Sequence, residues 1–302
     1  MRFDHLVTSQ LVDLRALRAY LVAHAVEGVD DVEVLADGAT RHRRLVLVAA
    51  GRCLLTVAIP AGQVGTPAVA VEGVDTVASA PDAVYDAIAV GRRWLGLDLD
   101  PAPGVAALAA DPVLGPLVRA RPHLRVPGAV DAFEAAVNIV LGQHVSLAAG
   151  RVFAARLVAA HLSTRLEGLR SFPRPEALAG LDADELRADI GITGARARTL
   201  VALARAVTDG GLDLSPTTDP DQRAKTRAAL LDLPGVGPWT ADLVALRCLR
   251  DPDVFLPGDL VLRKAMGGVS AGEAARTAER WAPHRSLAVL HLWTHHAIDP
   301  PG

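Results

Sequence analysis

Cysteines, aromatic residues and long apolar runs are all scarce in this sequence. With only two cysteines in 302 residues, the chain cannot bind an iron–sulfur cluster that needs four thiolates. Cys53 and Cys248 lie in apolar segments, and we expect them to be buried thiols in a reducing cytoplasm. No apolar run reaches the ~18 residues of a membrane span, and the first ten residues lack the basic-then-apolar pattern of a signal peptide. We therefore expect a cytoplasmic protein without a membrane segment.

An excess of positive charge is missing as well. The chain has 31 Lys and Arg against 34 Asp and Glu, a net charge of −3, and a pI near 6.4. This balance argues against a protein that binds nucleic acid through its overall charge, although the local placement of Arg and Lys can matter more than their sum. The hydrophobic fraction of 51% is ample for a packed core, and the length predicts two domains or one large one.

The first third of the sequence predicts a mixture of helix and strand. Apolar residues recur at helical spacing over 11–26 and again over 83–95. Between these segments lie short β-rich runs bounded by Gly and Asp, at 32–35, 44–48 and 53–60. We expect a few antiparallel strands with helices on one face, which is an α+β domain.

From about residue 106 the sequence predicts helices almost throughout. The preceding stretch 98–104 has the Pro- and Asp-rich composition of a linker. Asp131 is a suitable N-cap, and Glu134 would complete a variant of the capping box. The fold class is therefore α+β, with a small amino-terminal domain over 1–105 and an all-α domain over 106–302. Helices of the second domain are expected at 133–142, 146–161, 175–190, 195–207, 223–232, 238–250, 271–281 and 284–297.

Residues 233–266, LPGVGPWTADLVALRCLRDPDVFLPGDLVLRKAM, carry most of the functional information. We expect Gly235 and Gly237 to adopt the positive φ angles of a tight turn, and Pro238 suits the first turn of the following helix. Such a turn directs unpaired backbone N–H groups and a helix N-terminus outward, toward a phosphate. Asp259 follows in the first turn of another helix. A phosphate-binding hairpin with a carboxylate and an aromatic residue nearby indicates chemistry on a nucleic-acid base.

This segment resembles the helix-hairpin-helix and the following catalytic loop of DNA glycosylases, and it is most similar to those of the bacterial 3-methyladenine DNA glycosylase II family. The similarity covers most of the chain and is most specific over 231–293. Outside the hairpin it is carried by RPHLRVPG (121–128), DAFE (131–134), LGQHVS (141–146), AERWAPHRS (278–286) and LHLW (290–293), and more weakly by 20–29.

The resemblance implies a small α+β domain beside an all-α core, with the hairpin at about 224–249. It implies a hydrolase of base excision repair that flips alkylated purines such as 3-methyladenine out of double-stranded DNA and leaves an abasic site. Glycosylases with lyase activity form a Schiff base through a lysine, and the aligned position here is Trp239, so a monofunctional enzyme is expected. It also implies a monomeric bacterial enzyme that is cytoplasmic, associates with the nucleoid when bound to DNA and requires no cofactor.

Asp259 is the candidate catalytic residue. Cleavage of an N-glycosidic bond develops positive charge on the deoxyribose, as in an oxocarbenium ion. A fixed carboxylate stabilises that charge and can also orient or deprotonate water. The alternative from position alone is a helix N-cap, a role well suited to an Asp that follows Pro-Gly.

Three aromatic residues are candidates for the base pocket. The resemblance places Trp239 and Trp293 at pocket positions and adds Tyr20 from the first domain. An indole face can stack on a flipped base and attract the positive charge of an alkylated purine, whereas the alternative for a tryptophan is core packing. Leu243 and Leu260 stand where the best-known members have tyrosines. Because aromatic residues total only 4%, we expect a wider and more apolar pocket.

Further candidates concern contact with DNA. The resemblance places Gln143 and His144 in a turn whose side chain fills the gap left by the extruded nucleotide. It also places the backbone of Gly235, Val236 and Gly237 against a DNA phosphate. Four basic residues flank the presumed site and either contact phosphate or are simply solvated: Arg247, Arg250, Arg263 and Lys264.

The resemblance also implies one metal site. The backbone carbonyls of Leu231, Leu233 and Val236 would hold a monovalent cation, Na⁺ or K⁺, that faces the DNA phosphate. Zinc is not expected, because His291 and His295 have the i, i+4 spacing of helical ligands but no further ligand is evident nearby.

Two other functions remain open from the sequence. The chain could bind damaged DNA through its helix-hairpin-helix without catalysis. It could also be a glycosylase for a neutral lesion such as hypoxanthine or uracil, for which Leu243 and Leu260 leave room. No general acid is evident, which agrees with cationic purines as substrates because they leave readily.

Overall fold

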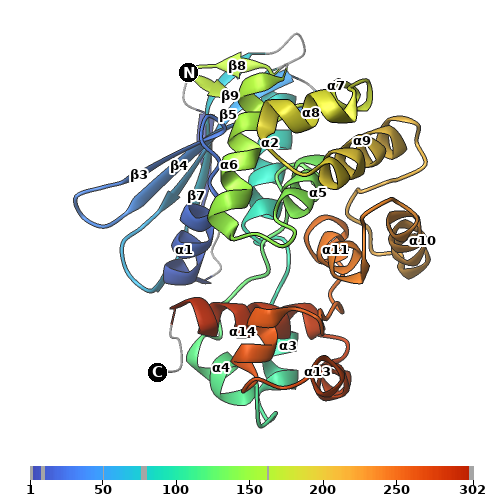
Figure 1. The fold of residues 1–302 in the computed structure, drawn as a ribbon. Coiled ribbons are helices and arrows are strands. Elements are labelled where there is room, and N and C mark those ends of the chain that lie inside the picture. Colours follow the sequence, from blue (N-terminus) through green and yellow to red (C-terminus); the bar gives the residue numbers. More distant parts are fainter. Residues whose placement is uncertain (1–2, 8–10, 50, 76–79, 162, 299–302) are drawn as a thin grey trace.

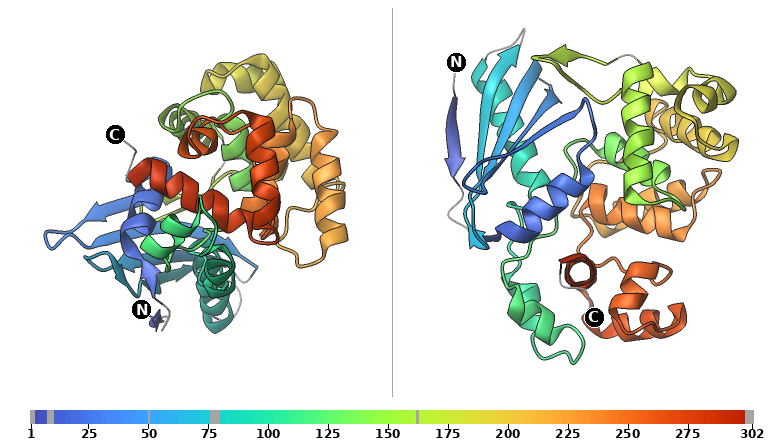
Figure 2. Two further views of the ribbon diagram at one scale, coloured as in Figure 1. Left: turned by 90° about the horizontal axis from the view of Figure 1, so that it is seen from below. Right: turned by 60° about the vertical axis from the view of Figure 1, so that its left-hand side comes forward.

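A five-stranded antiparallel sheet forms one side of the molecule and helices form the rest (Figure 1). The computed structural model describes residues 3–7, 11–49, 51–75, 80–161 and 163–298. Two further views show that the sheet and the helices lie side by side (Figure 2). In spatial order the strands are β1 (Phe3–Val7), β7 (Ala68–Asp75), β5 (Gly51–Ile59), β4 (Thr40–Val48) and β3 (Asp30–Val34).

The sheet is built around the β4–β5 hairpin and is covered by two helices. β4 and β5 pair along nine residues each, from Thr40 with Ile59 to Val48 with Gly51. The helices α1 (Leu14–His24) and α2 (Ala80–Trp94) bury their apolar residues against β5 and β7. A second, two-stranded sheet pairs β2 (Val12–Asp13) with β6 (Val64–Gly65).

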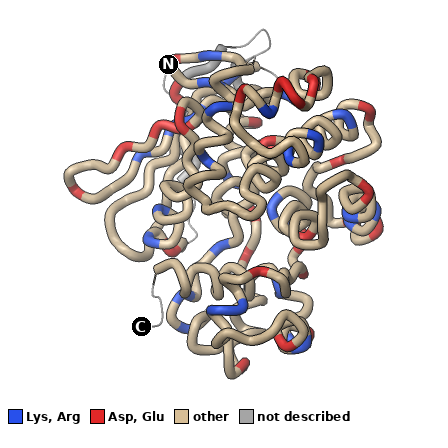
Figure 3. The backbone as a smooth tube through the Cα atoms, viewed as in Figure 1, with Lys and Arg blue, Asp and Glu red and all other residues tan. Residues whose placement is uncertain are grey.

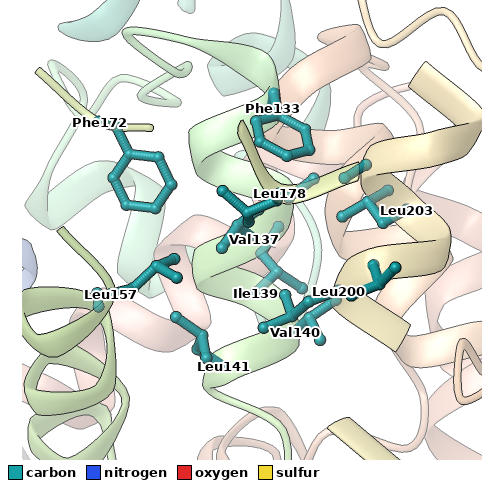
Figure 4. Close-up of a cluster of buried hydrophobic side chains, with 14 of the residues drawn as sticks. Phe133, Val137, Ile139, Val140, Leu141, Leu157, Phe172, Leu178, Leu200 and Leu203 are labelled. Atoms are coloured by element: carbon teal, nitrogen blue, oxygen red, sulfur yellow. The ribbon is translucent and has the colours of Figure 1, made fainter. Parts of the chain in front are cut away.

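The upper lobe of the helical region is arranged around α5 (Ala132–Leu141). Its residues Phe133, Val137, Ile139 and Val140 are buried against neighbouring helices (Figure 4). The Asp131 side chain caps α5 by accepting a hydrogen bond from the Glu134 backbone N–H at 2.8 Å. The other helices of this lobe are α6 (Leu147–Ala160), α7 (Pro175–Ala179), α8 (Ala183–Ile190), α9 (Gly194–Thr208), α10 (Pro220–Leu231) and α11 (Pro238–Val244).

The lower lobe joins two segments that are far apart in the sequence. Helices α3 (Ala102–Leu108) and α4 (Gly115–Ala120) share a buried core with α12 (Leu260–Ala265), α13 (Ala271–Ala278) and α14 (Arg285–Ile298). A 3₁₀ turn, Glu279–Trp281, follows α13. The predicted linker at 98–104 extends too far, because α3 already begins at Ala102.

A short β-hairpin interrupts the segment for which helices were predicted. It pairs β8 (Arg165–Leu166) with β9 (Leu169–Arg170), with Gly168 at φ +84° in the turn. Leu169 packs against Leu45 and Leu54 of the sheet. The hairpin is therefore stabilised by a tertiary contact that local sequence patterns do not reveal. Among the described residues, no helix is long and apolar enough to cross a membrane.

Buried charges join the sheet to the upper lobe. Arg44 of β4 donates from Nη2 to both carboxylate oxygens of Glu134, at 2.7 and 2.8 Å, and Arg44 Nη1 lies 3.3 Å from Asp30 Oδ1. His42 Nε2 is 2.8 Å from the same Asp30 oxygen. Burial raises the pKa of Glu134 despite Arg44. Burial also acts to raise the pKa of Asp30, but Arg44 and His42 outweigh it and lower that pKa. The Glu134 side chain is thus an inter-domain partner rather than part of a capping box.

Candidate active site

The predicted hairpin is formed by α10, a tight turn and α11, which continues as a π-helical turn over Ala245–Leu249. Gly235 has φ +78°, and a Cβ there would lie 2.3 Å from Thr199 Oγ1. That hydroxyl donates to the Pro234 carbonyl at 2.8 Å, so glycine is required by both conformation and space. The expectation of a positive φ at Gly237 is wrong: this residue is the extended N-cap of α11, with φ −100°.

The turn between α5 and α6 packs against the hairpin. Gln143 Nε2 donates to the Gly235 carbonyl at 3.1 Å and to Thr240 Oγ1 at 2.8 Å. Gln143 therefore holds two parts of the protein together, and its contact with DNA stays a prediction. His144 follows with an exposed side chain and φ +55°. Of the two predicted residues, His144 is the more exposed.

Asp259 accepts three hydrogen bonds from N–H groups. As N-cap of α12, it accepts from the Leu262 backbone at Oδ1, at 2.9 Å. Trp293 Nε1 also donates to Oδ1 at 3.2 Å, and Trp239 Nε1 donates to Oδ2 at 3.0 Å. Asp259 is therefore the N-cap of α12 and also lies next to both tryptophans. The three donors fix the carboxylate while none of them carries a positive charge.

A cavity of about 550 Å³ lies beside this carboxylate, between the sheet domain and the two helical lobes. Trp239, Trp293, Tyr20 and Leu243 line it, as the pocket prediction requires. Asp259 is not among the described residues that line the cavity, but it accepts hydrogen bonds from Trp239 and Trp293, which do. The prediction for Leu260 is wrong: this side chain is 58% exposed and absent from the described walls, which include its neighbour Val261 instead.

The flanking basic residues are mostly committed to the protein itself. Arg247 donates from Nη1 to the Pro127 carbonyl at 3.0 Å and lies over the rings of Tyr20 and Trp293. Arg250 donates to the Val126 carbonyl and to Asp98, at 2.9 and 2.7 Å. Arg263 donates from Nε to the Val269 carbonyl at 2.8 Å, and its predicted contact with DNA stays a prediction. Lys264 is exposed.

Two groups of cavity residues are missing from the sequence-based site. His24 lies one helical turn after Tyr20, and this i, i+4 relation could have indicated it. The buried cluster of Asp30, His42, Arg44 and Glu134 also lines the cavity. Arg44 and Glu134 are 90 positions apart, so no local pattern points to the cluster. In the view of Figure 3, Lys and Arg residues are interspersed with Asp and Glu along the backbone.

Comparison with known proteins places this geometry in a family. The AlkA N-terminal domain family matches residues 8–131, and the HhH-GPD superfamily of base excision DNA repair proteins matches residues 137–283. The chain is 43% identical to DNA-3-methyladenine glycosylase 2 of Escherichia coli over 183 residues, or 60% of this chain and 63% of the relative. It is 31% identical to DNA-3-methyladenine glycosylase of Bacillus subtilis over 212 residues, or 67% of this chain and 69% of the relative. The first match spans less than two thirds of the relative's length.

The fold agrees with these matches. A solved structure of a 3-methyladenine DNA glycosylase from Archaeoglobus fulgidus superposes with a TM-score of 0.75 at 19% identity, covering 98% of this chain and 99% of that one. The architecture and the hairpin define a helix-hairpin-helix protein of the HhH-GPD superfamily. Within that superfamily, the chain belongs to the DNA-3-methyladenine glycosylase family that has an AlkA N-terminal domain.

Proposed function

We propose that this protein is a monofunctional DNA glycosylase of base excision repair. It extrudes an alkylated purine such as 3-methyladenine from double-stranded DNA and hydrolyses its N-glycosidic bond, leaving an abasic site. One observation carries the proposal: the carboxylate of Asp259 is held by three neutral N–H donors next to an aromatic-lined cavity. Its negative charge is fixed in place and is not neutralised by those donors.

The geometry suggests where each part of the nucleotide lies. The base enters the cavity against Trp239 and Trp293, whose faces attract a cationic purine. The sugar stays outside the base cavity, near Asp259, which is bonded to the two tryptophans of the cavity wall. As the glycosidic bond breaks, its electrons leave with the base, and the carboxylate stabilises the positive charge that develops on the sugar. Water then adds to the sugar, and Asp259 is placed to accept its proton.

Three parts of the upper lobe support contact with DNA. Gly235 and Gly237 are exposed in the hairpin turn and offer backbone N–H groups to a phosphate, whereas Val236 between them is buried. His144 is exposed at the adjacent turn and can fill the gap in the base stack. The carbonyls of Pro234 and Gly235 accept from Thr199 and Gln143. The Leu233 carbonyl accepts from the Val236 N–H at 3.2 Å and has a second lone pair. We propose that it joins the carbonyls of Leu231 and Val236 around a monovalent Na⁺ or K⁺ ion at the hairpin, a structural role that requires no other cofactor.

The test is single-turnover base release from methylated duplex DNA by the wild type and by Asp259→Asn. Asparagine caps helices as well as aspartate but carries no charge. We expect the wild type to release methylpurine and the variant to lose ~100-fold or more of the rate, the effect of removing one preorganised charge-stabilising group. Equal rates would overturn the role of Asp259. Binding without release by the wild type would establish a non-catalytic protein that binds damaged DNA.

A second substrate class is favoured by the side chains at two positions. Leu243 gives the cavity an apolar wall, and Leu260 lies outside it, so neither position contributes a ring that would attract a cation. Aromatic rings bind a cationic base more strongly than a neutral one. With fewer rings in this pocket, the disadvantage of a neutral purine such as hypoxanthine is smaller. Release of hypoxanthine and 7-methylguanine from matched duplexes measures this. A hypoxanthine rate indistinguishable from spontaneous loss would exclude the second class.

A further inference from the structure

One end of the cavity contains polar groups that the proposed reaction does not use. There, α1 of the sheet domain faces the π-helical turn that follows the hairpin. His24 and Arg247 flank the Tyr20 ring: the His24 and Tyr20 ring centroids are 4.2 Å apart, and the Arg247 guanidinium carbon is 5.0 Å from the Tyr20 centroid. Both side chains line the cavity, and His24 is exposed there. Polar groups of two domains therefore meet where a base would enter.

The hydrogen bonding of His24 fixes its tautomer. Its Nδ1 lies 2.8 Å from the Tyr20 carbonyl oxygen, and a carbonyl can only accept. Nδ1 therefore carries the hydrogen, which makes Nε2 of the neutral ring an acceptor. The His24 ring opens into the cavity but is surrounded by protein atoms, and this desolvation, followed by the charge of Arg247, lowers its pKa to about 4. At neutral pH the ring thus offers one acceptor and no charge.

Arg247 supplies the complementary donors. Its Nη1 is anchored to the Pro127 carbonyl at 3.0 Å, and the guanidinium also lies over Trp293, 5.7 Å from the ring centroid. No acceptor for Nη2 or Nε is found among the described residues. A guanidinium presents its donors in a rigid plane, so this anchored group offers N–H donors in a fixed orientation. The cavity wall beside Tyr20 therefore carries an oriented donor, Arg247, and an oriented acceptor, His24 Nε2.

We propose that His24 and Arg247 recognise the edge of the extruded base, and that they suit a 6-oxopurine. Arg247 donates to the purine O6, and His24 Nε2 accepts from the neighbouring N1–H. The proposal rests on the proposed function, because the base must enter this cavity. Its effect is largest for a neutral base such as hypoxanthine. Such a base gains no cation–π attraction from the tryptophans and so depends more on hydrogen bonds.

The test compares two neutral bases that differ at the recognised edge. Hypoxanthine has O6 and N1–H, whereas unsubstituted purine lacks both. Single-turnover release of each is measured, and the hypoxanthine-to-purine ratio of every variant is compared with that of the wild type, which cancels differences in leaving ability. We expect His24→Leu to lower this ratio about tenfold and Arg247→Met about 10- to 100-fold, the range for losing a neutral and a charged hydrogen bond. His24→Gln, which keeps an acceptor, should recover part of the ratio.

Controls separate this proposal from the function on which it rests. Arg187→Met removes an exposed arginine of α8 and should leave the ratio unchanged. Free hypoxanthine and free purine are also titrated, with the ¹⁵N resonance of His24 Nε2 as readout, which needs no catalysis. A shift with hypoxanthine but not with purine supports the pair even if no base is ever released from DNA. Equal loss of both substrates in His24→Leu, or an unshifted resonance, would overturn the pair even in an active enzyme.

Discussion

Two carboxylates near the cavity have opposite surroundings. Asp259 accepts only from neutral donors, two indoles and one backbone N–H. Glu134 is almost fully buried and accepts from the guanidinium of Arg44 at 2.7 and 2.8 Å. The charge of Glu134 is therefore compensated by a partner, and that of Asp259 is not. A carboxylate with a cationic partner has little attraction left for a cation that develops during a reaction, whereas one held by dipoles retains its full charge.

The comparison assigns a structural role to Glu134 and a chemical role to Asp259. Glu134 and Arg44 lie on different domains and connect them. Asp259 is positioned by residues of the hairpin helix and of α14, which come from the two helical lobes. Trp239 packs against the cores of both lobes. Removing the partner of Glu134 should therefore lower the stability of the protein, and changing Asp259 or its partners should lower the rate of base release.

The largest expected effect is the loss of stability in Arg44→Met. Without the guanidinium, Asp30 and Glu134 are left buried without their cationic partner, and breaking a buried ion pair costs about 3–5 kcal/mol. Urea unfolding at pH 7 measures the free energy. Because burial already raises the pKa of Glu134, the unpaired carboxyl should take up a proton more readily. The loss should then shrink as the pH falls toward 5.

The same strand provides a matched control. Arg41 of β4 is paired with Glu33 at 2.5 Å, but the two side chains are 41% and 54% exposed. An exposed ion pair contributes about 0–1 kcal/mol, so Arg41→Met should change the unfolding free energy by no more than that. Equal losses in Arg41→Met and Arg44→Met would show that the buried cluster does not hold the domains together.

Asp259→Asn should have the reverse effect, a large loss of activity with little loss of stability. The expected ~100-fold decrease in base release corresponds to about 2.7 kcal/mol of transition-state stabilisation. Asparagine retains the N-cap oxygen for Leu262, so the unfolding free energy should change by less than about 1 kcal/mol. Both quantities are measured on one preparation. A variant that unfolds as readily as Arg44→Met would remove the distinction between the two carboxylates.

The sequence predicts the Asp259 side of this comparison much better than the Glu134 side. The hairpin is encoded locally, by Gly235, Pro238 and the helix that follows, and local signals such as the Ser146 cap also predict α6. The resemblance then places Asp259 and the tryptophans together. β7, in contrast, is rich in small residues and is a strand because it pairs with β1 and β5. Val69 and Val71 do alternate with less buried residues, as in a strand, but the small residues around them weaken that signal in a single segment.

The remaining errors have the same physical origin. Glu134 fits a capping box in sequence, yet its side chain pairs with Arg44 of another domain. Leu260 aligns with a pocket residue, but as the first residue of α12 its side chain is exposed to solvent. In each case the residue type was compatible with two partners, and only the tertiary arrangement selects one.

His291 of α14 differs from both carboxylates: it is a buried titratable group without a hydrogen-bond partner in the part of the chain that the structure describes. It is 1% exposed, and neither ring nitrogen has a hydrogen-bond partner among the described residues. Burial, followed by the charge of Arg121, lowers its pKa to about 4 from an unfolded value near 6.5. Between these values the unfolded state binds more protons, so stability is constant above pH 6.5 and falls as the pH drops toward 4.

This titration predicts an acid-dependent loss of stability that His291→Leu should reduce. Between pH 7 and pH 5 the loss from His291 is about 2 kcal/mol, from ~1.4 kcal/mol for each unit of pKa difference. The difference between wild type and variant isolates it, because other groups titrate in both. Parallel stability curves for the two proteins over this range would show that His291 is already protonated or solvated in the folded state.

The smallest expected effect concerns the donors that hold Asp259. Trp293→Phe keeps a ring for stacking but removes the N–H that donates to Oδ1 at 3.2 Å. The carboxylate retains Trp239 and the Leu262 N–H, so base release should fall only about tenfold, the value of one hydrogen bond to a charged group. Trp281→Phe makes the same change in the core of the lower lobe, away from the cavity, and should alter stability but not release. If Trp293→Phe releases base at the wild-type rate, the indole N–H does not position the carboxylate, and ring stacking alone accounts for this tryptophan.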